Sequence, residues 1–343
     1  MRKDFKENLL NILNGVSTGV VIALVPGALV NELMKNIAHS GSGAQNILTM
    51  TSLMGSLLAV FAGLCVSYLL KFNLIQSGSL MAVAMIVSGA FQVKNGQIML
   101  SGSGDVINIA LTITLAAFLV KFLSKKLGSY TVLLLPLLVA VIAGEIGQFT
   151  LPYTQMVTGA VGQTIGTLPN FQPLVVGMLM GIAFAALIVS PISSVGIAMA
   201  IGVEGIVSGS ANLGITACAF TWAIMSNGFG TTIAHFIGTP KIQMANMLKN
   251  PRLFLPVIAS PGIAGLVGAI FEISGTANSA GFGSAGLIGP MAAYQEMAGG
   301  LLAIGFIMLL FAGMPIFLGF AMRYIFIQKL QFVRKEDLVI EDK

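Results

Sequence analysis

The scarcity of charged residues is the feature that most constrains the fold of this chain. Its 343 residues include 17 Lys and Arg and 12 Asp and Glu, together 8%, whereas a soluble globular domain carries about 25%. So few charges cannot cover a surface that faces water, and apolar residues make up 56% of the sequence. The composition therefore excludes an ordinary soluble enzyme, a disordered chain and a nucleic-acid-binding protein. It predicts an all-α polytopic membrane protein.

Apolar runs of about 20 residues are long enough to cross a membrane as helices. The sequence holds ten candidates, of which the run at 195–207 is too short to cross alone and predicts a broken or tilted helix. The ten are 15–34, 48–70, 78–93, 106–123, 131–148, 173–190, 195–207, 213–235, 253–273 and 301–322. The first run follows a basic flank but has no small-residue cleavage site after it, so we expect a retained helix rather than a signal peptide.

The basic residues predict the orientation of the helices. Ten spans put both termini on one side of the membrane. With the termini in the cytoplasm, all but two of the 17 basic residues, Lys35 and Lys94, lie inside. This bias follows the positive-inside rule. The sequence therefore predicts a multi-pass protein of the cell (inner) membrane, embedded in the lipid bilayer, with both termini cytoplasmic.

A weak internal repeat suggests two related halves. Gly15 and Gly19 recur at a constant offset as Gly177 and Gly181, and five predicted helices lie on each side of residue 173. An odd number of helices per half predicts inverted copies, a common design of secondary transporters. Chance is the alternative, because small residues recur every fourth position in many packed membrane helices. The predicted division is a cytoplasmic flank at 1–14, a first transmembrane half at 15–148, an outer loop or re-entrant segment at 149–172, a second half at 173–325 with a binding hairpin at 274–290, and a cytoplasmic tail at 326–343.

A glycine-rich stretch near the end of the chain is a candidate substrate site. The residues from Ile273 to Gln295 contain too many glycines for a straight helix, yet no charge falls between Glu272 and Glu296. Irregular backbone survives at membrane depth only where protein or a water-filled cavity surrounds it. The stretch therefore predicts a substrate-binding hairpin, with a loop on the outer surface as the alternative.

Further candidates come from a polar cluster and from isolated carboxylates. Thr231 and His235 are four residues apart and share a helix face, which would suit a polyhydroxylated ligand or a packing seam. Glu204 and Glu272 lie in or beside apolar runs, where an ionised group costs at least about 2.5 kcal/mol at the bilayer centre. They could bind sugar hydroxyls or relay a proton, and the alternative is a solvated helix end. The candidate substrate-binding residues are Glu204, Asn227, Thr231, His235, Glu272, Thr276, Asn278 and Ser284.

The sequence indicates no catalytic residue, metal site or cofactor. Cys65 and Cys218 are isolated thiols, and the two His residues are far apart, so neither a disulfide framework nor a zinc site is expected. A phosphate-binding loop with its lysine is also missing from the sequence, which argues against an ATPase.

Several motifs together resemble the membrane (IIC) component of phosphoenolpyruvate-dependent sugar phosphotransferase systems. The resemblance covers about residues 8–325, and it is to a stand-alone branch that includes proteins of the perfringolysin-regulator type. It rests on Asn14-Gly15-x3-Gly19-x6-Pro26, on Ser190-Pro191-Ile192-Ser193-Ser194, on Asn250-Pro251 with Pro256, and on the run Gly281–Gly289.

The resemblance implies a homodimeric transporter that moves a sugar inward. A separate cytoplasmic IIB partner would then phosphorylate the sugar, with Lys121–Lys126 and Lys241–Arg252 as candidate docking surfaces. The run Gly281–Gly289 lacks the glutamate motif of better-known sugar IIC hairpins. Two alternatives stay open: a membrane sensor with the same fold, and a proton-coupled secondary transporter that works without phosphotransfer.

Overall fold

A computed structural model describes most of the chain, and the helical membrane fold expected from the sequence is confirmed. The chain divides into two compact units, Met1–Val157 and Thr158–Asp342, which we call the first and second unit. The described residues are 2–35, 42–94, 97–100, 102–166, 172–190, 192, 194–226, 240–276, 279–297 and 300–338.

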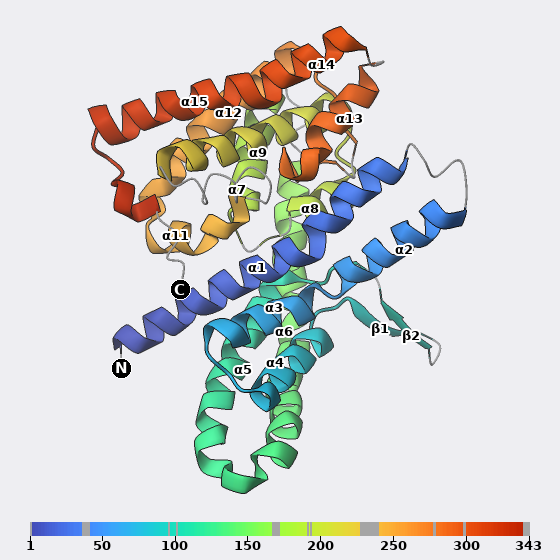
Figure 1. Ribbon diagram of the computed structural model, residues 1–343, viewed down its shortest axis with the longest axis vertical. Helices are drawn as coiled ribbons and strands as arrows, with labels where there is room; N and C mark the ends of the chain where they lie inside the picture. The colour runs from blue at the N-terminus through green and yellow to red at the C-terminus, as the bar shows by residue number, and fades with distance from the viewer. Residues whose placement is uncertain are drawn as a thin grey trace. The chain divides into compact units, whose positions relative to one another are not determined.

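The first unit consists of helices and one β-hairpin (Figure 1). The two antiparallel strands lie between α4 and α5, and α6 continues from this unit into the second. Its elements are α1 (Arg2–Lys35), α2 (Ser42–Ser56), α3 (Leu58–Leu69), α4 (Leu74–Ile86), β1 (Phe91–Lys94), β2 (Gln97–Leu100), α5 (Val106–Leu127), η2 (Gly128–Tyr130) and α6 (Thr131–Gly166).

Glycine allows the backbones of α1 and α3 to approach closely. A Cβ atom built on Gly15 would lie 2.6 Å from the backbone nitrogen of Val66, so only glycine fits there. A buried amide ties α4, α5 and α6 of the first unit together. Asn108 on α5 donates to the carbonyl oxygens of Val87 (2.8 Å) and Gly147 (2.9 Å), which belong to the end of α4 and to α6.

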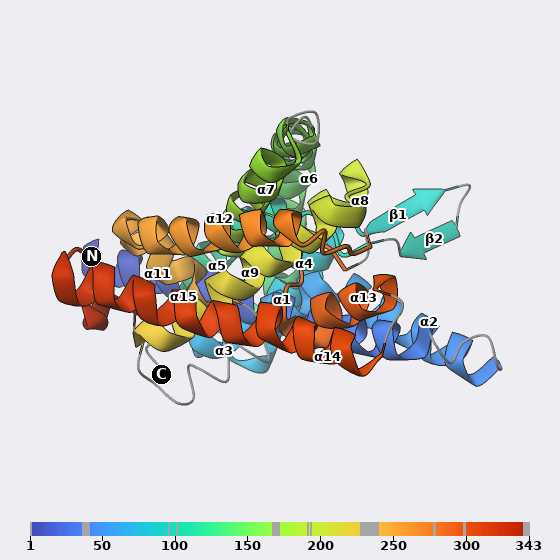
Figure 2. The ribbon, with the colours of Figure 1, turned by 90° about the horizontal axis from the view of Figure 1, so that it is seen from above.

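The second unit is a bundle built around α7, α9 and α12 (Figure 2). One π-helical stretch, η8, joins α14 to α15, and a second, η9, extends this continuous helix to Lys329. The elements are α7 (Pro173–Ile188), α8 (Ser194–Ile201), α9 (Gly205–Ser226), η5 (Pro240–Gln243), α11 (Met244–Lys249), η6 (Pro251–Leu253), α12 (Phe254–Ile270), η7 (Ala285–Leu287), α13 (Ile288–Glu296), α14 (Leu301–Met308), η8 (Leu309–Gly313), α15 (Met314–Arg323), η9 (Tyr324–Lys329) and η10 (Lys335–Leu338).

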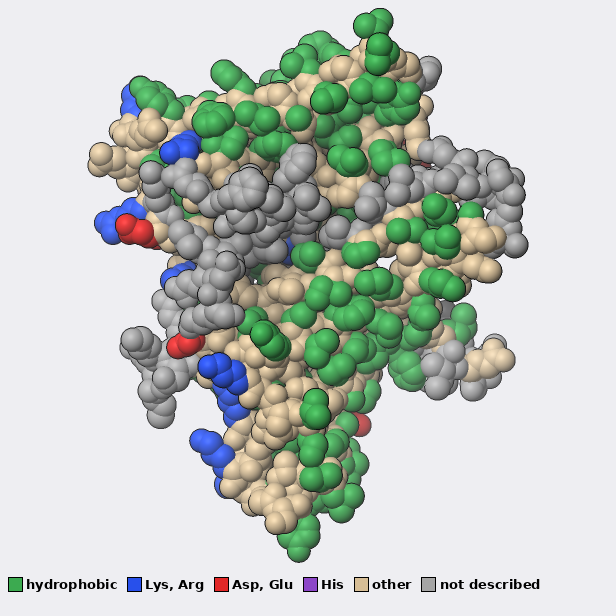
Figure 3. Space-filling model, in the orientation of Figure 1, with side chains coloured by type: hydrophobic (Ala, Val, Ile, Leu, Met, Phe, Trp, Pro, Cys, Tyr) green, Lys and Arg blue, Asp and Glu red, His purple; other side chains and the backbone are tan. Residues whose placement is uncertain are grey.

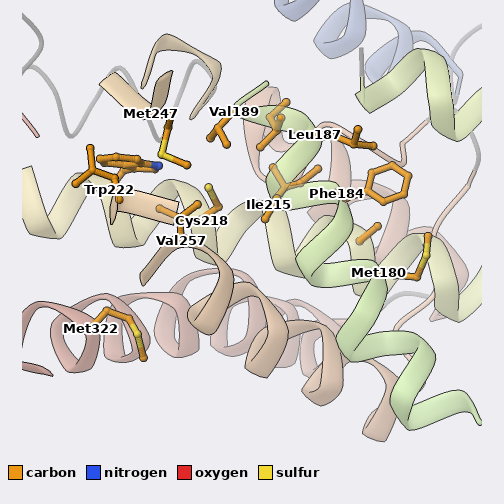
Figure 4. Packing of buried hydrophobic residues seen from close by; sticks show 14 of the residues in the cluster. Met180, Phe184, Leu187, Val189, Ile215, Cys218, Trp222, Met247, Val257 and Met322 are labelled. Carbon is orange, nitrogen blue, oxygen red and sulfur yellow. The ribbon is translucent and has the colours of Figure 1, made fainter. Parts of the chain in front are cut away.

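The core of the second unit combines close helix crossings with large apolar side chains. A Cβ atom on Gly177 of α7 would lie 2.5 Å from Cβ of Ala269 on α12. Towards the other end of these helices, Trp222, Cys218 and Met247 lie in one buried cluster (Figure 4). Gly15 and Gly177, which match in the internal repeat, thus both occupy tight helix crossings. The inverted relation of the two halves stays a prediction.

The described helices differ in several places from the expected spans. Four helical runs among the described residues are long and apolar enough to cross a membrane, or five if α2 and α3, bent by 51°, form one span. The count of ten spans therefore stays a prediction. The run 78–93 changes from helix to strand, since α4 ends at Ile86. Residues 149–166, expected as an outer loop or a re-entrant segment, continue α6 as helix with Pro152 inside it.

Apolar side chains cover much of the visible surface (Figure 3). Leu302 is 92% exposed and Leu133 is 74% exposed. A protein in water rarely exposes apolar side chains on this scale. The exposed apolar helices therefore agree with a protein whose solvent is largely lipid.

The helix crossing at Gly177 leads to a test of packing. Gly177→Ala should lower the free energy of unfolding by about 1–3 kcal/mol, because the added methyl group must displace α12. Gly305→Ala is the matched control, since a Cβ atom on Gly305 in α14 meets open space. Thermal denaturation of the detergent-solubilised variants measures both effects, and equal stability of the two variants would contradict the crossing.

Candidate functional site

The candidate site begins where α12 ends and the glycine-rich hairpin (residues 274–290) starts. Helix α12 closes with a Schellman motif, in which the amide of Ile273 donates to the carbonyl oxygen of Gly268 at 2.9 Å. The motif places Glu272 in the left-handed region at φ 50°, a position that usually holds glycine. The motif directs the chain sharply away from the helix axis, and the side chain of Glu272 is exposed.

The start of the hairpin pairs with the start of α9. Gly205 and Gly275 exchange two backbone hydrogen bonds of 2.9 and 3.0 Å in an isolated antiparallel bridge. Because neighbours of an antiparallel bridge oppose each other, Glu204 lies across from Thr276. Glu204 is exposed and Thr276 is half-buried. The bridge thus brings together two candidate residues that are far apart in the sequence.

Buried polar side chains of α9 hold the hairpin in place. Ser208 donates to the carbonyl oxygen of Thr276 at 2.8 Å. Asn212, one turn later, accepts a hydrogen bond from the amide of Gly283 at 3.2 Å and donates to the hydroxyl of Ser279 at 3.3 Å. Ser208, Asn212 and Ser279 are completely buried. The irregular backbone therefore finds its partners inside the protein, as it must where water is excluded.

Glycines allow the hairpin to lie directly on α9. A Cβ atom on Gly209 would overlap the carbonyl oxygen of Ile273. A Cβ atom on Gly283 would lie 2.5 Å from Cγ2 of Ile215, and Gly283 also has a φ of 62°. The glycines of this region are thus required by close contact and by backbone conformation.

The structure describes half of the residues predicted to bind substrate. Glu204, Glu272 and Thr276 lie near the Gly205–Gly275 bridge, and Ser284 lies further along the hairpin, where it is buried. The other four predicted residues, Asn227, Thr231, His235 and Asn278, lie outside the described residues. The substrate-binding role of all eight stays a prediction.

Sequence reasoning missed the residues that support the hairpin. Ser208 and Asn212 were not among the predicted site residues, although their spacing puts both polar groups on one face of an apolar helix. A polar pair at this spacing, beside Gly205 and Gly209, was the available signal. Small and polar residues on one helix face indicate that backbone, rather than side chains, packs against this face.

The helices of the second unit have defined relative directions. Gly177 and Gly181 of α7 face Ser210 and Gly214 of α9 in the same order, so these two helices run parallel. The same two glycines face Ala269 and Pro261 of α12 in reverse order, so α12 runs antiparallel. The start of α9 therefore lies at the same end of the bundle as the end of α12.

Three carboxylates share one end of this bundle, and bases predominate at the opposite end. Glu204 and Glu272 flank the start of α9 and the end of α12, and Glu296 precedes α14, whose Phe306 packs edge-on against Phe271. We call this the acidic end. The opposite, basic end carries Lys241, Lys249, Arg252, Arg323 and Lys329, and it also holds the two acids of η10, Glu336 and Asp337.

Lys241 differs from the other bases because it is buried. Only 2% of its surface is exposed, and its Nζ donates to the carbonyl oxygens of Ser190 (2.6 Å) and Ile192 (3.0 Å). Burial lowers the pKa of Lys241 from its usual 10.5 to about 7. The expectation that Lys241 contributes to a docking surface is therefore wrong, whereas Lys249 and Arg252 are exposed.

A comparison with protein families supports the resemblance seen in the sequence. A family model described as "Phosphotransferase system, EIIC" matches residues 10–340. The match spans both units, including the hairpin and its supporting helix α9. No curated protein matched the chain in a separate search.

Replacing Asn212 tests how the hairpin is held. Asn212→Leu should lower the free energy of unfolding by about 1–3 kcal/mol, because the buried amide of Gly283 loses its acceptor. Thr216→Val is the control, since the hydroxyl of Thr216 donates to the carbonyl oxygen of Asn212 within α9. Thermal denaturation and protease cleavage at residues 274–290 measure the effect. A hairpin that is no more accessible in Asn212→Leu than in Thr216→Val would contradict this anchoring.

The pKa of Lys241 predicts how stability depends on pH. The unfolded chain keeps the Lys241 proton up to about pH 10.5, whereas the native protein releases it near pH 7. Because the unfolded state binds more protons in this window, the free energy of unfolding should rise with pH. We expect the melting temperature of the unmodified protein, measured relative to that of Lys241→Met at the same pH, to increase from about pH 7 to about pH 9. Lys249→Met, at an exposed position, should show no such trend, and a flat difference for Lys241→Met would overturn the prediction.

Proposed function

The chain belongs to the EIIC family of the phosphotransferase system, and on that premise we propose that it carries a small neutral polar solute across the plasma membrane. The family is a membrane component of sugar transport, so a sugar or a sugar derivative is the proposed solute. The observation that carries the proposal is the hairpin, which is anchored on α9 with exposed Glu204 and Glu272 beside it.

The chemistry of these groups supports a hydroxylated ligand. An ionised carboxylate only accepts hydrogen bonds, and hydrogen bonds to charged groups are worth about 1.5–3 kcal/mol. Sugar hydroxyls supply matching donors. The backbone of the hairpin is held by Ser208 and Asn212, so these acceptors are attached to a positioned element rather than to a free loop.

The charge distribution supports a neutral solute over an anionic one. Glu204, Glu272 and Glu296 share the acidic end, and the bases of the second unit lie at the other end. Like charges repel, so a sugar acid or a sugar phosphate would approach this end unfavourably. A neutral polyol meets no such barrier.

We assign phosphorylation of the transported sugar to a separate partner protein. The family implies a cytoplasmic IIB protein, and we propose that such a partner docks on exposed bases. Lys249 and Arg252 in the second unit, and Lys125 and Lys126 in the first, are exposed. Lys121 is less suited, because its Nζ donates to Oδ1 of Asn8 at 2.7 Å. We also propose a homodimer with both termini in the cytoplasm.

Carboxamide variants test the role of the two carboxylates. Glu204→Gln and Glu272→Gln should each weaken sugar binding by about 10-fold or more, because a charged acceptor is lost. Glu296→Gln is the matched control, as an exposed carboxylate at the same end that does not flank the bridge. Thermal stabilisation of the purified protein by a panel of sugars, sugar acids and organic acids identifies the ligand, and uptake into vesicles then measures transport.

The outcomes separate the proposed function from its alternatives. If the protein binds a neutral sugar and also takes it up, the transporter is supported. The dependence of this uptake on added IIB protein then measures phosphotransfer. Sugar binding without uptake would indicate a sensor. Uptake driven by a proton gradient and abolished in Glu204→Gln or Glu272→Gln would indicate proton coupling. Ligands found only among the acids would overturn the proposal.

A further inference from the structure

The C-terminal segment Gln331–Leu338, here called the tail, folds back onto the second unit. The chain reverses at Gln331, which has a φ of 48°, and the amides of Phe332 and Val333 both donate to the carbonyl oxygen of Phe326. Val333 and Leu338 are buried in the same cluster as Trp222. The tail is therefore a packed part of the unit rather than a free end.

A completely buried glutamine bonds to the tail. Nε2 of Gln243 donates to the carbonyl oxygen of Leu338 at 3.3 Å. Oε1 of Gln243 accepts a hydrogen bond from Asn246 at 2.6 Å, which fixes the orientation of the amide. The last turn of the tail thus depends on the segment 240–246, here called the clamp.

The same clamp bonds to the connection between α7 and α8. Lys241 precedes Gln243 by two residues on η5, and its Nζ donates to the carbonyl oxygens of Ser190 and Ile192. These carbonyls follow the last turn of α7. A buried lysine that donates to two carbonyls resists displacement, because breaking the contact leaves its buried amine without these partners.

Helix α8, which follows this connection, in turn bonds to the hairpin. Ser194 at the start of α8 is buried and donates to the carbonyl oxygen of Gly281 at 2.9 Å. Gly281 has a φ of 96°, and a Cβ atom there would lie 2.7 Å from the backbone nitrogen of Val195. The contact leaves no space for the hairpin to shift while α8 stays in place.

We propose that the clamp couples the tail to the glycine-rich hairpin, so that displacing the tail loosens the hairpin and ordering the hairpin tightens the tail. Coupling of this kind is reciprocal. A cytoplasmic protein that binds the tail would therefore change the affinity of the hairpin for its ligand. The identity of that ligand and the cytoplasmic side of the tail rest on the proposed function. The coupling itself is a property of the described contacts.

Hydrogen–deuterium exchange on the full chain in detergent tests the coupling without any ligand. Leu338→Asp places a charge in the cluster and should release the tail. We expect exchange to rise about 10-fold in the tail and also in the hairpin amides, among them Gly283 and Gly289, for the loss of about one buried hydrogen bond. Arg334→Ala is the matched control, because the side chain of Arg334 is exposed on the same tail. It should leave the hairpin unchanged.

A second variant places the coupling in the clamp. Lys241→Met removes the contact with the α7–α8 connection and should raise exchange in the hairpin about 10-fold. Combined with Leu338→Asp, it should raise hairpin exchange no further than either change alone, because both break one path. Additive effects, or a hairpin unchanged in Leu338→Asp, would overturn the proposal.

The test also allows for unfolding of a variant. If Leu338→Asp raises exchange throughout α7, α9 and α12, the whole bundle is destabilised, and Gln243→Met is then used in place of Leu338→Asp. Gln243→Met removes the hydrogen bond to Leu338 but keeps the side-chain volume. An unchanged hairpin in that variant counts against the coupling. If the protein binds no sugar but shows coupled exchange, the proposed function is contradicted and the coupling is still supported.

Discussion

Backbone that leaves the helical conformation inside an apolar protein must find hydrogen-bond partners there, because lipid supplies none. In the second unit this requirement falls on one face of α9. Ser208 and Asn212 bond to the hairpin at Thr276, Ser279 and Gly283. The hairpin can therefore be irregular and still be positioned. The exposed carboxylates of Glu204 and Glu272 lie beside backbone that these buried groups hold in place.

Close approach between backbones sets the form of both units. In water the hydrophobic effect would drive helices together, but among lipid chains packing and hydrogen bonds must do so. Gly15 on α1 and Gly177 on α7 remove the side chains that would keep their partner helices apart. The same device brings the hairpin onto α9 at Gly209 and Gly283. Small residues thus act in helix packing and in site construction alike.

Much of the architecture could be predicted from the sequence, and the exceptions have physical reasons. Low charge predicts the membrane class, and the glycines around Gly281 predict the irregular hairpin. The strand at Phe91–Lys94 was missed because a short apolar run does not distinguish strand from helix. The helix through Pro152 was missed because proline is tolerated inside long membrane helices. The burial of Lys241 could not be foreseen, since its partners are backbone carbonyls far away in the sequence, which no residue pattern reveals.

The separation of charge along the second unit has an electrical consequence. Glu204, Glu272 and Glu296 lie at one end of the bundle, and bases outnumber acids at the other, so the unit carries a dipole along its helices. A membrane potential acts on such a dipole with about 2.3 kcal/mol per elementary charge per 100 mV. Any motion that carries either end part of the way through the membrane field therefore moves charge. The rate of that motion becomes sensitive to voltage, even when the transported solute is neutral.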